Sequence, residues 1–159
     1  MKKTLLVLYI SLFVAGLVLA GCDKPKPEWV DLGPDTSYDH IWSVNIGSIT
    51  KIQKEAVDNN IRINSSAPIK RDVYAVWVKV EPGSRPSTIW KRRSKDGRKL
   101  QYYMDRYFVD LANHEIARVE EVLYFGPGSA QSLYAGEGFE GVVPGSQGDD
   151  MFKVVVKYR

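Results

Sequence analysis

Cysteine and histidine are scarce in this sequence. Its 159 residues include one cysteine, Cys22, and two histidines, His40 and His114. A single cysteine excludes a disulfide within the chain, and two distant histidines with no cysteine nearby do not form the usual ligand pattern of a zinc site. Asp149 and Asp150 lack the further acidic residues of a calcium-binding loop. We therefore expect a fold held by packing alone, with no metal ion and no organic cofactor.

Motifs of nucleotide binding and nucleophilic catalysis are also lacking. Residues 136–141, Gly-Glu-Gly-Phe-Glu-Gly, match the letters of the dinucleotide-binding fingerprint, but only 18 residues follow, and Pro144 interrupts them. The fingerprint needs a preceding strand, a helix that begins at the loop and an acidic residue about 20 positions later. Serine follows glycine at four places, never in the Gly-x-Ser-x-Gly motif of a hydrolase. We expect a flexible loop at residues 136–141 and a protein that is not an enzyme.

The first 21 residues have the three parts of an export signal. Lys2 and Lys3 give a positive start, residues 5–19 form an apolar run, and Leu-Ala-Gly at residues 19–21 precedes Cys22. This order is typical of a secretory signal peptide. The cleavage site resembles the lipobox of bacterial lipoproteins, in which the cysteine thiol receives a lipid before the chain is cut. The alternative is an uncut transmembrane helix, since the apolar run approaches the roughly 20 residues of a span.

Cleavage before Cys22 predicts three parts of the chain. They are a lipoprotein signal peptide at residues 1–21, the lipidated cysteine with a polar, proline-broken tether at residues 22–28, and one domain at residues 29–159. Removal of the signal peptide also removes two lysines, so the number of basic side chains decreases from 22 to 20, against 19 acidic ones. We expect an exported, almost neutral domain that its lipid anchors in the bacterial cell envelope.

Asp23 bears on which membrane holds the protein, because it directly follows the lipidated cysteine. In enteric bacteria an aspartate at this position resembles the signal that retains a lipoprotein in the inner membrane. The residue therefore counts against surface exposure in an organism that sorts lipoproteins in this way. The sequence alone therefore leaves both the inner and the outer membrane as locations of the anchored protein.

The domain has the alternating apolar residues and the turn residues of a mostly antiparallel sheet. Residues 73–80 are apolar on both faces, as in a central strand, and residues 112–114 suit a hairpin connection. Residues 51–63 fit either a short helix or an extended segment. Strands are expected at residues 29–30, 38–52, 73–80, 100–111, 115–125 and 132–135.

The C-terminal segment, residues 148–157, fits either a helix or a strand. Ser146 with Asp149 three residues later matches a capping box, and acidic residues favour the first turn of a helix. Three successive valines at residues 154–156 favour a strand instead. The local sequence leaves the two alternatives equal.

Several segments of the domain share a pattern with known proteins. They are Tyr-Ala-Val-Trp-Val at residues 74–78, the tyrosine-rich residues 102–110, the strand with Tyr124 and Gly126, and Val-Val-Pro-Gly-Ser at residues 142–146 before Met151-Phe152. Over residues 29–158 the chain resembles the surface-adhesin protein E family of bacterial lipoproteins. The resemblance implies an α+β domain in which a C-terminal helix packs across an antiparallel sheet, and so favours a helix at residues 148–157.

The resemblance also implies a cysteine pair that this chain lacks. Members of the family commonly join a strand to the last helix by a disulfide, and the matching positions here are Leu111 and either Val155 or Val156. An apolar pair can replace such a bridge by packing. Met151, Val155 and Tyr158, spaced i, i+4 and i+7, are expected to face the sheet.

Basic side chains are concentrated in one segment, residues 85–99, which we call the basic loop. It holds seven cations against one acid, Asp96, beside the apolar pair Ile89-Trp90. Such a local positive field predicts docking to anionic lipid head groups, lipopolysaccharide phosphates or an acidic host polymer. The alternative is a solvated loop that keeps the sheet edge soluble. The candidate anion-binding residues are Arg85, Trp90, Lys91, Arg92, Arg93, Lys95, Arg98 and Lys99.

Together these features favour a lipid-anchored binding module of the cell envelope. The leading function is adhesion to a host matrix protein or an anionic polymer, because founding members of the resembled family bind host matrix proteins. The other expected partner is the membrane, through the lipid; nucleic acid is not expected, since an envelope protein rarely meets it. A periplasmic accessory lipoprotein that helps an envelope complex to assemble is the runner-up, and an enzyme ranks third.

Overall fold

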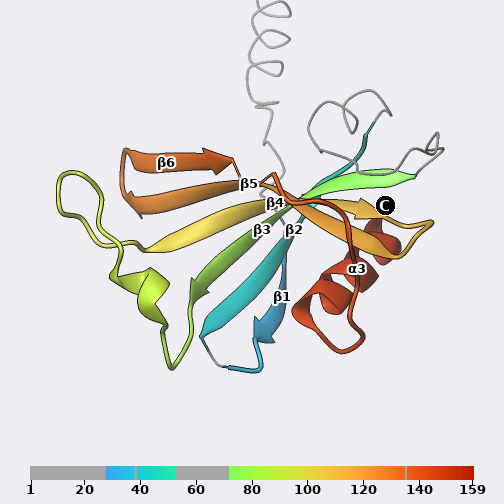
Figure 1. Cartoon of the computed structure of the whole chain (residues 1–159), viewed down its shortest axis with the longest axis horizontal. Helices are drawn as coiled ribbons and strands as arrows, with labels where there is room; N and C mark the ends of the chain where they lie inside the picture. Colours follow the sequence, from blue (N-terminus) through green and yellow to red (C-terminus); the bar gives the residue numbers. More distant parts are fainter. Residues whose placement is uncertain (1–27, 38, 53–71, 135) are drawn as a thin grey trace, which may run out of the picture.

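The computed structural model describes residues 28–37, 39–52, 72–134 and 136–159 (Figure 1). Within these ranges, one seven-stranded antiparallel sheet has the strand order β1-β2-β3-β4-β5-β6, and β7 pairs with the start of β5. The α+β class expected from the sequence is confirmed. The elements are β1 (Trp29–Pro34), β2 (His40–Lys51), β3 (Val73–Pro82), the 3₁₀ helix η1 (Thr88–Lys91), β4 (Tyr102–Asp110), β5 (Glu115–Gly126), β6 (Ser129–Tyr134), β7 (Glu140–Gly141) and α3 (Gln147–Tyr158).

β3 lies in the middle of the sheet, between β2 and β4, as its apolar sequence predicts. Val76, Val78 and Val80 on one face are fully buried, and Ala75 on the other face is buried as well. A strand that is apolar on both faces is stable only where both faces are covered. The expected hairpin connection also forms, with β4 and β5 joined by a tight turn at residues 111–114.

A β-bulge changes the register between β4 and β5. Arg106 pairs with Glu120, but the next residue, Tyr107, pairs with Arg118, so Val119 is the extra residue of β5. In a regular strand, residues three apart point to opposite faces. The bulge removes one step of this alternation, so that Arg118 and Glu121 lie on the same face of the sheet.

The ambiguous C-terminal segment is a helix, α3, that packs against β1 and β2. Ser146 is its N-cap and accepts a hydrogen bond from the Asp149 amide (3.2 Å). The Asp149 carboxylate accepts from the amide of Gly145 (2.8 Å), and not from that of Ser146 as in a capping box. This hydrogen bond lowers the pKa of Asp149, so the carboxylate stays charged at the positive end of the helix.

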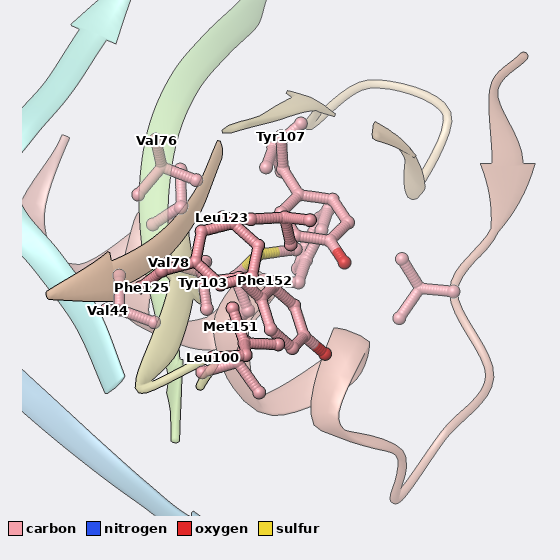
Figure 2. Packing of buried hydrophobic residues seen from close by; sticks show 14 residues of the cluster. Val44, Val76, Val78, Leu100, Tyr103, Tyr107, Leu123, Phe125, Met151 and Phe152 are labelled. Atoms are coloured by element: carbon pink, nitrogen blue, oxygen red, sulfur yellow. The ribbon is translucent and has the colours of Figure 1, made fainter. Parts of the chain in front are cut away.

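The main core lies between α3 and the sheet face that it covers. Figure 2 shows Met151 and Phe152 of α3 among the side chains of Leu123 and Tyr103 from the sheet. A smaller cluster on the opposite face includes Phe108. The helix buries apolar side chains against a sheet face that would otherwise be exposed to water. The free energy gained by this burial outweighs the strand propensity of the three valines.

The helix faces the sheet largely as expected, with one correction. Met151 and Val155 are fully buried, but Tyr158 is 41 % exposed, so its expected burial is wrong. Tyr158 lies in the last turn of α3, beyond the part of the helix that the sheet covers. Leu111 packs against the core cluster that contains Val155, whereas Val156 is exposed.

Some expectations fall outside the described residues. These are the signal peptide at residues 1–21, Cys22, Asp23, nearly all of the tether at residues 22–28 and most of the ambiguous segment 51–63. In the ranges that are described, none of the helices has the length and hydropathy needed to cross a membrane.

Candidate functional site

Trp90 attaches the basic loop to the sheet. It lies in η1, and its indole N–H donates to the carbonyl oxygen of Asp39 (3.2 Å). Its ring centroid lies 5.7 Å from that of His40 and 5.6 Å from that of Tyr103. His40 is itself held by the Asp35 carboxylate (2.9 Å). Trp90 is therefore part of the loop's attachment to β2 and β4, and its indole N–H is already used within the protein.

The rest of the loop is folded into a small hairpin. Arg93 and Lys99 form an antiparallel bridge, and the amide of Gly97 donates to the carbonyl of Ser94 (3.0 Å). Gly97 has φ +83°, a backbone conformation that glycine adopts at little cost. Arg98 then ties the hairpin to the β5–β6 turn, because its guanidinium donates to the carbonyl of Pro127 (2.9 Å).

The seven cations of the loop have different surroundings. Arg98 pairs with Asp96 (2.8 Å), and Arg92 lies 3.8 Å from a carboxylate oxygen of Glu121. Arg85 is exposed at the start of the loop. Four exposed cations remain that have no carboxylate partner in the part of the chain that the structure describes. They are Lys91, Arg93, Lys95 and Lys99.

A partly buried charge network, which the sequence did not reveal, lies on the same sheet face as the loop attachment. Asp105 on β4 is 1 % exposed. Arg118 lies 3.8 Å from Asp105 and 3.5 Å from Glu121, and it also pairs with Glu137. The bulge at Val119 brings Arg118 to this face. The hydrophobic pattern of β5 does not indicate where the register changes by one residue. The sequence therefore could not show that Arg118 and Asp105 are neighbours.

The network is incompletely paired. Oδ1 of Asp105 and Nε of Arg118 are buried and have no hydrogen-bond partner among the described residues, where Oδ2 of Asp105 accepts a long bond from the Tyr107 hydroxyl (3.4 Å). Burial raises the pKa of Asp105 to about 7, against the opposing effect of Arg118. A carboxyl group with such a pKa suits proton transfer near neutral pH. At 1 % exposure, however, Asp105 is out of a substrate's reach.

The other residues that the sequence singled out have structural contacts. The ring of His114 lies against Phe152 of α3, with 4.1 Å between the ring centroids. Within residues 136–141, Glu137 pairs with Arg118, and Glu140–Gly141 form β7. Across the described ranges, no three His, Cys, Asp or Glu side chains lie close enough together to hold a metal ion.

Comparison with known proteins gives no family model and no curated protein that matches the chain. The resemblance to the surface-adhesin protein E family therefore stays a prediction. The function has to be argued from the basic loop and its surroundings.

Proposed function

We propose that this chain is a lipid-anchored, non-enzymatic binding module of the bacterial cell envelope that holds an acidic polysaccharide on its basic loop. The anchor is the lipid that the lipobox sequence predicts on Cys22. One observation supports the binding role above others: Lys91, Arg93, Lys95 and Lys99 are exposed and lack carboxylate partners among the described residues, yet their loop is firmly attached to the sheet.

The arrangement of other lysines argues against a role in solubility alone. Lys51 pairs with Asp72 (2.6 Å), Lys79 with Glu81 (2.8 Å) and Lys153 with Asp149 (3.0 Å). Mixed charges of this kind already keep a surface soluble. Four cations on one loop that have no carboxylate partner in the described part of the chain repel each other instead, so their grouping is better explained by a polyanion that offsets the repulsion.

An acidic polysaccharide fits the loop better than a single small anion. The four cations lie within the nine residues 91–99, and each can meet a different charge of a repeating polymer. Acidic glycans of the host matrix have such repeating charges. This ligand also agrees with the adhesive role that the family resemblance implies.

A periplasmic accessory role is the second candidate, and Asp23 favours it. If Asp23 retains the lipoprotein in the inner membrane, the basic loop faces the periplasm and meets an anionic polymer of the envelope itself. Antibody binding to intact cells distinguishes the two candidates, because the antibody can bind a surface adhesin but cannot reach a periplasmic protein.

Chromatography on immobilised heparin, an acidic polysaccharide, tests the proposal. The full chain, purified in a non-ionic detergent, is expected to bind at about 0.1 M salt and to elute as salt rises, since exposed charges are screened over about 8–10 Å in this range. The triple variant Lys91→Ser, Arg93→Ser and Lys99→Ser should bind about tenfold more weakly, because three exposed ion pairs of about 0.5 kcal/mol each together contribute about 1.4 kcal/mol.

A matched variant controls for net charge. Lys51→Ser, Lys157→Ser and Arg159→Ser remove the same charge at the C-terminal end of α3 and at the end of β2, where Lys51 interacts electrostatically with Arg159. Helix α3 lies away from the basic loop (Figure 1). This variant should elute with the wild type. Equal weakening by the two triple variants, or wild-type protein in the flow-through, contradicts the proposal.

A further inference from the structure

A cavity lies beside the basic loop, between the loop and the β5–β6 hairpin. Its volume is about 420 Å³, within the range of about 300–1,000 Å³ that is typical of ligand pockets. Both of its walls lie at the same end of the sheet (Figure 1). The loop contributes Ser94, Lys95 and Asp96, and the hairpin contributes Phe125, Ser129, Ala130 and Gln131.

The walls of this cavity are fixed to each other. Arg98 bridges them, because it pairs with Asp96 on the loop (2.8 Å) and donates to the carbonyl of Pro127 at the hairpin turn (2.9 Å). Ser94 also hydrogen-bonds to Asp96. Farther along, the amide of Gln101 donates to the carbonyl of Tyr124 (2.8 Å). A cavity with such walls is largely formed before a ligand arrives, which reduces the entropic cost of binding.

The charge of the cavity is positive. The carboxylate of Asp96 is balanced by Arg98, so the ammonium group of Lys95 is the cation in excess. Lys95 is exposed and has no carboxylate partner in the described ranges. The cavity therefore favours a ligand with a negative group.

The remaining lining suits a sugar ring. Ser129 and Gln131 offer a hydroxyl and an amide for hydrogen bonds to ring hydroxyls. Phe125 is only 4 % exposed, so it presents no open aromatic face on which a nucleobase stacks. A compact ligand with many hydroxyl groups and one negative group matches these features.

We propose that this cavity binds one anionic sugar unit, a monosaccharide or disaccharide that carries a sulfate, phosphate or carboxylate group. The inference rests on the proposed function, because the same unit within a long polysaccharide lies next to the exposed cations of the basic loop. Lys95 pairs with the negative group, and Gln131 and Ser129 bind the ring hydroxyls. The cations of the basic loop then bind successive negative groups along the polymer, and the cavity determines which sugar unit is bound.

Two neighbouring residues of β6 give a matched pair of variants. Gln131 pairs with Leu123, whose side chain is in the main core, and therefore points to the face that carries the loop. Ser132 points to the opposite face, since successive residues of a strand alternate. Both are exposed. Gln131→Trp fills the cavity without changing charge, and Ser132→Trp adds the same ring outside it.

Titration calorimetry of the full chain in detergent tests the inference with a sulfated heparin disaccharide and with glucosamine 1-phosphate. The two probes separate a host glycan from a lipopolysaccharide sugar as the source. We expect binding of at least one probe, a loss of about tenfold or more in Gln131→Trp, and wild-type affinity in Ser132→Trp. Wild-type affinity in Gln131→Trp, or binding of neither probe, overturns the inference.

The same variants distinguish this inference from the proposed function. Gln131→Trp should still be retained on heparin, because its loop cations are intact. The triple variant of Lys91, Arg93 and Lys99 should keep its affinity for the short probe within a few-fold. Retention of the wild type on heparin without binding of either probe refutes the sugar site alone, and absence of retention refutes the proposed function.

Discussion

Asp105 lies inside the protein, and the guanidinium of Arg118 lies 3.8 Å from its carboxylate. In the unfolded chain this carboxyl group ionises near pH 3.8, whereas in the folded protein burial raises its pKa to about 7. Between these two values the folded state keeps a proton that the unfolded state has released. The free energy of unfolding therefore falls as pH rises through this window.

The variant Asp105→Asn tests this pH dependence. Each pKa unit corresponds to about 1.4 kcal/mol, so ionised Asp105 costs up to about 4 kcal/mol of stability at about pH 8. The variant should be more stable than the wild type at about pH 8, and this advantage should shrink towards about pH 4. Urea unfolding over this pH range measures it. Glu140→Gln, a change at an exposed carboxylate, is the control, and equal pH profiles for wild type and Asp105→Asn contradict the account.

The sequence could not identify Asp105 and Arg118 as partners. Both lie in segments that were rightly predicted as strands, but the contact depends on the bulge at Val119. The sequence also did not predict that Trp90 packs against the sheet. Its indole N–H donates to the carbonyl of Asp39, which is 51 positions away in the sequence. Hydrophobic pattern shows which residues suit a strand, and it carries no information on such long-range contacts.

Helix α3 is the element whose conformation the local sequence left open. The N-cap at Ser146 was visible in the sequence, yet the valines gave an equally strong signal for a strand. The helix forms because Met151 and Val155 are fully buried against the sheet, which is a tertiary effect. The strands were easier to predict, because β3, β4 and β5 each combine apolar residues with turn residues at their ends.

Two adjacent valines of α3 provide a test of its packing. Val155 is fully buried, and Val156 is 42 % exposed. Val155→Asp buries a charge without a partner and should destabilise the protein by about 3–5 kcal/mol. Val156→Asp should change the free energy of unfolding by less than about 1 kcal/mol. Thermal unfolding followed by circular dichroism compares the two, and similar losses in both variants show that the helix is wrongly oriented.

At the scale of the whole molecule, the two functional features lie together at one end of the sheet. The basic loop and the cavity beside it lie at the end where β5 turns into β6, whereas α3 covers β1 and β2 (Figure 1). The fold class and the basic loop were both predictable from the sequence. The cavity was not, because its walls come from segments about 30 residues apart that meet only through contacts such as Arg98 with Pro127.

The central claim is that a lipid-anchored protein holds an acidic polysaccharide on its basic loop, and the capture of labelled heparin by cell-envelope membranes tests it most directly. Membranes that carry the wild type should capture heparin in a salt-sensitive way. Membranes from cells that express Cys22→Ser should contain little of the protein and capture little heparin. The triple variant of Lys91, Arg93 and Lys99 should stay in the membranes but lose most of the capture. Wild-type membranes that capture no more heparin than membranes without the protein contradict the account.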